Sequence, residues 1–184
     1  MGAFYTNISL NVPYSAAVHE AISRVFPSGS IITAGAWVTL CAEDIEQNLA
    51  EASRRLAALA KELRCRGAAI LNHDDSVLII LLANNGDNLL SYNSDPGYFS
   101  EADALSGPEI TGFDRLRTWN PAVNEIAVRK ILVSQDYTFA QERHAQLATA
   151  LGLPSSSIGA SENYLADGEY PNGVDQSSVI DIQR

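Results

Sequence analysis

The tetrad Asn72, His73, Asp74 and Asp75 lies between two apolar runs and holds the residue types in this sequence that are best suited to chemistry. A histidine ring changes charge near neutral pH, and an adjacent carboxylate favours its protonated form. Successive residues of an extended chain point to opposite faces, so His73 and Asp75 could converge whereas Asp74 would point away. One hypothesis is that His73 and Asp75 form an acid–base pair or part of a divalent-cation site.

The same tetrad also suits a turn between two strands. Asn, Asp and the following Ser76 bond to local backbone groups and tolerate unusual dihedral angles. The other two interpretations are therefore a polar turn and a turn whose tip contacts a partner. Two ligands do not make a metal site, and the sequence predicts no metal and no cofactor.

Residues 91–99 place a Pro-Gly turn among aromatic residues. These rings either cover the edge of a sheet or provide the rigid contact area of a recognition loop. We expect this loop to lie close to the hairpin that it follows. The candidate binding residues are Asn72, His73, Asp74, Asp75, Tyr92, Asp95, Tyr98 and Phe99.

His144 is the third candidate for catalysis, besides His73 and Asp75. It lies at or beside an apolar helical stripe, which favours a core-edge histidine with a polar partner and leaves a general base as the alternative. The chain has no H-E-x-x-H, nucleophile-elbow, Walker or dinucleotide motif. The sequence leaves an enzyme open but favours a protein without catalysis.

Hydrophobic periodicity predicts an α+β fold with a mainly antiparallel sheet of about five strands. Helices over 13–26 and 44–64 would pack on one face, and helices from 113 to 152 would form a C-terminal layer. Asn85-Gly86 is typical of a hairpin turn. We expect strands over 4–10, 31–42, 68–72, 77–83 and 88–93.

The helix over 44–64 has the clearest pattern. Asp44 can cap its start, and Gly67 is placed to end it. Glu51 and Arg55 are four residues apart, which predicts a solvated ion pair on the outer side of the helix.

The chain divides into four predicted segments of one domain. A sheet core over 1–94 is followed by a loop or boundary over 95–112, which is rich in Pro, Gly and acidic residues. A C-terminal helical layer over 113–170 precedes a tail over 171–184.

Net charge narrows the classes of partner. The formal charge of -10 would repel a phosphate backbone, so we expect no nucleic acid and favour a basic protein partner.

The longest apolar run, 77–83, is too short to span a bilayer. Cys41 and Cys65 fit reduced core thiols, so we expect a cytoplasmic protein with no membrane partner. The oligomeric state does not follow from the sequence.

Five segments of the chain form a recognisable set: FYTNI, LNHDD, YNSDPGYF, FAQERHAQLATALGLP and YLADGEYP. Together they resemble a family of uncharacterised bacterial proteins. The resemblance covers residues 4 to about 173 and implies one continuous folded unit, without implying an activity.

The sequence leads to three hypotheses about function. The first is a non-catalytic, intracellular, acidic binding or regulatory protein, and one form of it is an inhibitor of a basic protein partner, as an immunity protein inhibits a toxin. The second is a small cation-dependent or acid–base enzyme that uses His73 and Asp75. The third is a structural subunit of a larger assembly.

Overall fold

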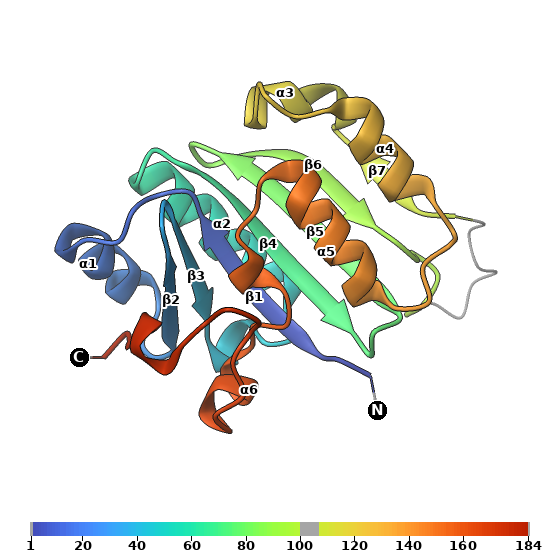
Figure 1. The fold of residues 1–184 in the computed structure, drawn as a ribbon. Helices are drawn as coiled ribbons and strands as arrows, with labels where there is room; N and C mark the ends of the chain where they lie inside the picture. The colour runs from blue at the N-terminus through green and yellow to red at the C-terminus, as the bar shows by residue number, and fades with distance from the viewer. Residues whose placement is uncertain (1, 100–106, 184) are drawn as a thin grey trace.

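A single antiparallel sheet organises the chain in the computed structural model, which describes residues 2–99 and 107–183 (Figure 1). The strand order is β7-β6-β5-β4-β1-β3-β2-β8. This architecture confirms the predicted α+β fold, but within the described residues the sheet has eight strands rather than about five. The strands are β1 Tyr5–Leu10, β2 Ser30–Ala34, β3 Trp37–Cys41, β4 Arg66–His73, β5 Val77–Asn84, β6 Asp87–Asn93, β7 Glu109–Thr111 and β8 Val179–Asp181.

The first strand lies at the centre of the sheet, and every residue of β1 is buried. It pairs with both β3 and β4, so segments far apart in sequence meet beside it. The predicted strand over 31–42 is a hairpin instead, because Gly35 takes a φ of 59° between β2 and β3. The Asn85-Gly86 turn joins β5 to β6 as predicted, with both residues at positive φ.

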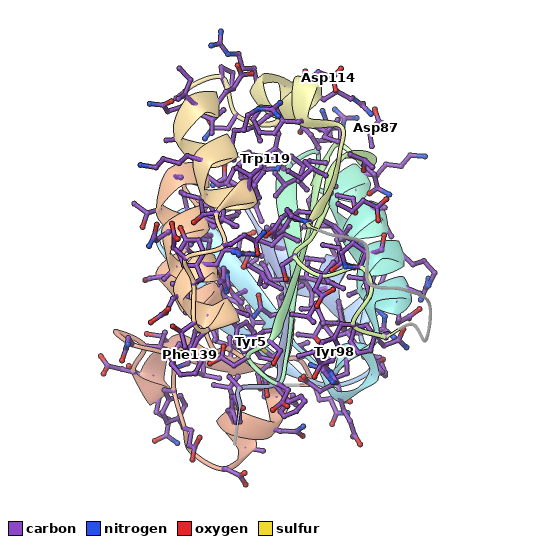
Figure 2. The ribbon with its side chains drawn as sticks, turned by 90° about the vertical axis from the view of Figure 1, so that its right-hand side faces the viewer. Tyr5, Asp87, Tyr98, Asp114, Trp119 and Phe139 are labelled. Atoms are coloured by element: carbon purple, nitrogen blue, oxygen red, sulfur yellow. The ribbon has the colours of Figure 1, made fainter. Side chains whose placement is uncertain are left out.

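Helices cover both faces of the sheet, as Figure 2 shows with the sheet seen on edge. One core lies beneath α1 and α2 and includes Ile8, Leu40 and Leu56. The other lies beneath α3, α4 and α5 and includes Trp119 and Leu147. The helices are α1 Ala16–Val25, α2 Leu49–Glu62, α3 Leu116–Trp119, α4 Glu125–Val133, α5 Ala140–Leu151 and α6 Glu162–Ala166. Short 3₁₀ turns are η1 Glu43–Ile45, η2 Phe113–Arg115, η3 Ser155–Ser157 and η4 Gln176–Ser178.

The boundaries of α2 differ from the predicted helix. Asn48, not Asp44, caps its start by accepting a hydrogen bond from the Glu51 amide. Its end is followed by Arg64 in a left-handed conformation, while Gly67 lies within β4. A Cβ on that glycine would lie 2.8 Å from the Ser9 carbonyl oxygen, so close strand pairing explains the glycine.

The prediction that Glu51 and Arg55 form a solvated pair on the outer side of α2 is wrong, because Arg55 is only 7% exposed. Its guanidinium bonds to Glu51 and Asp44 and lies 4.4 Å from the centre of the Phe26 ring. Helical spacing located the pair correctly but did not reveal that α1 and η1 enclose it.

The two short edge strands lie outside the predicted sheet core. β7 lies within the segment 95–112, and β8 lies within the predicted tail and pairs with β2. Residues 100–106 of the predicted loop lie outside the described residues.

Candidate functional site

The tetrad forms the turn between β4 and β5. Asp74 and Asp75 have φ of 51° and 55°, and the Ser76 amide donates to the His73 carbonyl across 3.0 Å. Small polar residues tolerate this left-handed conformation, which accounts for two carboxylates in succession. The turn sends its side chains to opposite sides of the sheet.

On the α2 side, His73 is oriented by Gln47. The Gln47 amide nitrogen donates to the Asn72 carbonyl across 3.0 Å, so its Oε1 accepts from His73 Nδ1 across 2.7 Å. This assignment places the proton of a neutral ring on Nδ1 and leaves Nε2 with a free lone pair. Gln47 itself takes a φ of 52° and donates its backbone N–H to Thr6 Oγ1.

Three aromatic rings surround His73, and we call Phe4, His73, Tyr98 and Phe99 the aromatic tip. The ring centres of Phe4, Tyr98 and Phe99 lie 5.0, 5.7 and 4.9 Å from that of His73, in edge-on geometry. Tyr98 is 42% exposed and Phe99 is 62% exposed. The structure thus brings three of the predicted binding residues, His73, Tyr98 and Phe99, into one cluster.

Asp75 lies on the α5 side of the sheet and has a structural role. Its Oδ1 accepts from the Gln141 amide across 2.8 Å and from Asn72 Nδ2 across 3.1 Å, so it holds the first turn of α5. Within residues 2–99 and 107–183 no hydrogen bond joins Asp75 to His73. Asp74 remains exposed and accepts from the Gly2 amide.

His144 lies in the core, fully buried, between two hydroxyl groups. Its Nδ1 is 2.8 Å from the Tyr5 hydroxyl, and its Nε2 is 3.2 Å from Ser157 Oγ. Ser157 donates to the Pro154 carbonyl, so its oxygen accepts from Nε2 and the Tyr5 hydroxyl donates to Nδ1. Burial lowers the pKa of His144 to about 3, so the ring is neutral and has two satisfied nitrogens.

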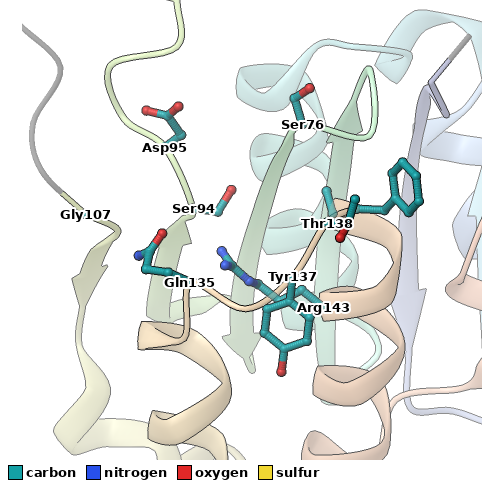
Figure 3. Close-up of a pocket in the computed structure, with 10 residues that line it drawn as sticks. Ser76, Ser94, Asp95, Gly107, Gln135, Tyr137, Thr138 and Arg143 are labelled. Atoms are coloured by element: carbon teal, nitrogen blue, oxygen red, sulfur yellow. The ribbon is translucent and has the colours of Figure 1, made fainter.

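Tyr92 is buried, and its hydroxyl donates to the Leu132 carbonyl. The same hydroxyl accepts from Arg143, which lines a cavity of about 290 Å³ together with Asp95 (Figure 3). Asp95 Oδ1 also accepts from the Gly97 amide and so shapes the turn before the aromatic tip. Tyr92 and Asp95 are therefore adjacent to this cavity rather than parts of the tip.

Sequence reasoning did not identify Phe4, Gln47 or Arg143. Phe4 and Gln47 reach the tip from segments distant in sequence, through the pairing of β1 with β4 and through the turn before α2. No local pattern signals these contacts. The spacing of apolar residues along α5 alone places Arg143 on the outer face of the helix, whereas the residue is 8% exposed because β6 and the segment after α4 enclose it.

Comparison with known proteins gives no match to a family model, a curated protein or a solved structure. Among residues 2–99 and 107–183, no group of at least three His, Cys, Asp or Glu side chains is arranged to hold a metal. None of the helices in this part of the chain has the length and apolar character required to cross a bilayer. A function must therefore rest on the residues of the site itself.

Proposed function

We propose that the protein is a non-catalytic binding protein that contacts a basic protein partner through the aromatic tip. The observation that carries the proposal is the gathering of Tyr98 and Phe99, both substantially exposed, around a histidine held by Gln47. Aromatic rings that keep contact area in water while their neighbours hold them in place are typical of binding hot spots.

The chemistry around the tip favours a cationic partner group. The exposed Asp74 directly follows His73 of the aromatic tip, and the whole protein carries a formal charge of -10. An arginine or lysine side chain gains from stacking on aromatic rings beside a carboxylate. An immunity protein that inhibits a basic toxin by covering its surface is one form of this function, and a subunit of a larger assembly is another.

An enzyme based on His73 and Asp75 receives less support from the geometry. The Asp75 carboxylate is engaged with Gln141 and Asn72 on the α5 side, while His73 faces Gln47 and the aromatic rings. A catalytic acid or base needs hydrogen-bond reach to its partner.

The direct test uses an arginine-rich peptide and a matched peptide in which citrulline replaces each arginine. Citrulline keeps the shape and removes the charge. Backbone amide shifts of the protein are followed by NMR during each titration. We expect saturable shifts at His73, Tyr98 and Phe99 with the arginine peptide and little response to the citrulline peptide.

The variant Tyr98→Ser/Phe99→Ser removes the exposed rings without changing charge. The matched control Ile126→Ser/Val133→Ser removes apolar side chains that are 84% and 48% exposed on α4. We expect the first variant to lose the response and the control to keep it. Shifts that appear on other acidic surfaces, or that persist in the first variant, would overturn the proposal.

A further inference from the structure

We propose that the cavity beside Arg143 binds a small organic monocarboxylate. This site is separate from the aromatic tip and does not depend on the function proposed for it. The cavity of about 290 Å³ lies between the start of α5, the segment that follows α4, and the ends of β5 and β6. Polar side chains line much of it, among them Ser76, Ser94, Gln135 and Thr138.

The neighbours of Arg143 hold its guanidinium in place. It donates to the Tyr92 hydroxyl across 2.5 Å and to the Ser134 carbonyl across 2.6 Å, and it lies 5.0 Å from the centre of the Tyr137 ring. Figure 3 shows its terminal nitrogens directed toward Ser94 and Gln135. A group held in this way loses little conformational entropy when a ligand binds.

No carboxylate of the described residues forms an ion pair with Arg143. Its side chain is nevertheless only 8% exposed. Its Nε–H is also buried without an acceptor in this part of the chain. A buried cation is costly unless an anion pairs with it, so an anion in the cavity would stabilise this arrangement.

A carboxylate fits these groups better than a more highly charged anion. Guanidinium groups bind the two oxygens of a carboxylate in a planar arrangement. Asp95 lines the same cavity and adds a negative charge to it. The Arg143 guanidinium would therefore have to offset the charge of Asp95 in addition to each charge of a phosphate. Hydroxyl and amide groups on the other walls suit a ligand with a polar substituent.

The test measures the binding of acetate, lactate and benzoate at constant ionic strength, with the corresponding amides as neutral controls. Amide shifts of Ser94 and Thr138 report on the cavity by NMR. We expect saturable shifts with at least one carboxylate and none with its amide. The Arg143→Met variant should bind at least about tenfold more weakly, the loss expected for a charged hydrogen bond.

A second variant keeps the proposal testable if Arg143→Met fails to fold. Asp95→Asn preserves the acceptor for the Gly97 amide and removes the negative charge, so carboxylate binding should become about two- to five-fold tighter. A gain in affinity does not arise from misfolding. Equal responses to a carboxylate and its amide, or an unchanged affinity in Asp95→Asn, would overturn the proposal.

Discussion

Acidification should destabilise the protein through His144. Burial lowers the pKa of the folded-state ring from its ordinary value of 6.5 to about 3. Between these values the unfolded chain binds a proton that the folded protein does not, so the stability contributed at higher pH is lost as the pH falls. At about pH 5, roughly 1.5 units below the ordinary histidine pKa, the free energy of unfolding is lower by about 2 kcal/mol, because each unit corresponds to about 1.36 kcal/mol.

Two carboxyl groups act in the opposite direction, which determines how the experiment must be designed. Burial raises the pKa of Glu46 to about 7, with a smaller contribution from the charge of Glu162, and burial also raises the pKa of Glu162. For these groups the folded state binds more protons than the unfolded chain in mildly acidic solution, so acidification favours folding. The wild-type pH profile alone therefore mixes opposing effects.

The comparison of wild type with His144→Asn separates them. Urea unfolding at several pH values gives the free energy of unfolding of each protein. The difference between the two should shrink by about 2 kcal/mol from about pH 8 to about pH 5, because only the wild type carries the titrating ring. Tyr5→Phe removes a hydrogen bond but keeps the ring, so its profile should remain parallel to wild type. Parallel profiles for wild type and His144→Asn would refute the reasoning.

Three further predictions concern groups around the sheet. Arg55→Met should lower the free energy of unfolding by about 2 kcal/mol, because it removes the charged hydrogen bonds of a buried guanidinium to Glu51 and Asp44, whereas the exposed Arg54→Met should cost less than about 1 kcal/mol; equal losses in urea unfolding would contradict this. Asp75→Ala should cost about 1–2 kcal/mol and speed hydrogen exchange of the Gln141 amide, and unchanged exchange would show that Asp75 does not hold α5. Zinc, manganese and magnesium should leave the melting temperature unchanged, and a rise that disappears in His73→Ala/Asp75→Ala would support a cation site instead.

The sequence predicted those parts of the fold that local patterns encode. The stripe of α2, the Asn85-Gly86 hairpin and the antiparallel run from β4 to β6 depend on spacing and turn chemistry within short segments. The position of β1 at the centre of the sheet depends instead on long-range pairing with β3 and β4. The edge strands β7 and β8 are only three residues long, too short for a pattern of alternation to be recognised.

The candidate site shows the same limit. The residue types alone pointed to the turn at 72–75 and to the aromatic residues after β6. The alternation of side chains along an extended chain, however, suggested that His73 and Asp75 could converge. The left-handed conformations of Asp74 and Asp75 break that alternation and direct Asp75 toward α5. Gln47, Phe4 and Arg143 become part of the two sites only through tertiary packing.

The most direct test of the central claim is affinity capture from the native cell, followed by titration of the purified partner. Wild type, Tyr98→Ser/Phe99→Ser and the control Ile126→Ser/Val133→Ser serve as matched baits. We expect a basic partner that wild type and the control bind alike, that weakens as salt rises, and that the tip variant binds about 30-fold or more weakly, as for a loss of about 2 kcal/mol at a hot spot. A partner that binds the tip variant as tightly as wild type would contradict the account.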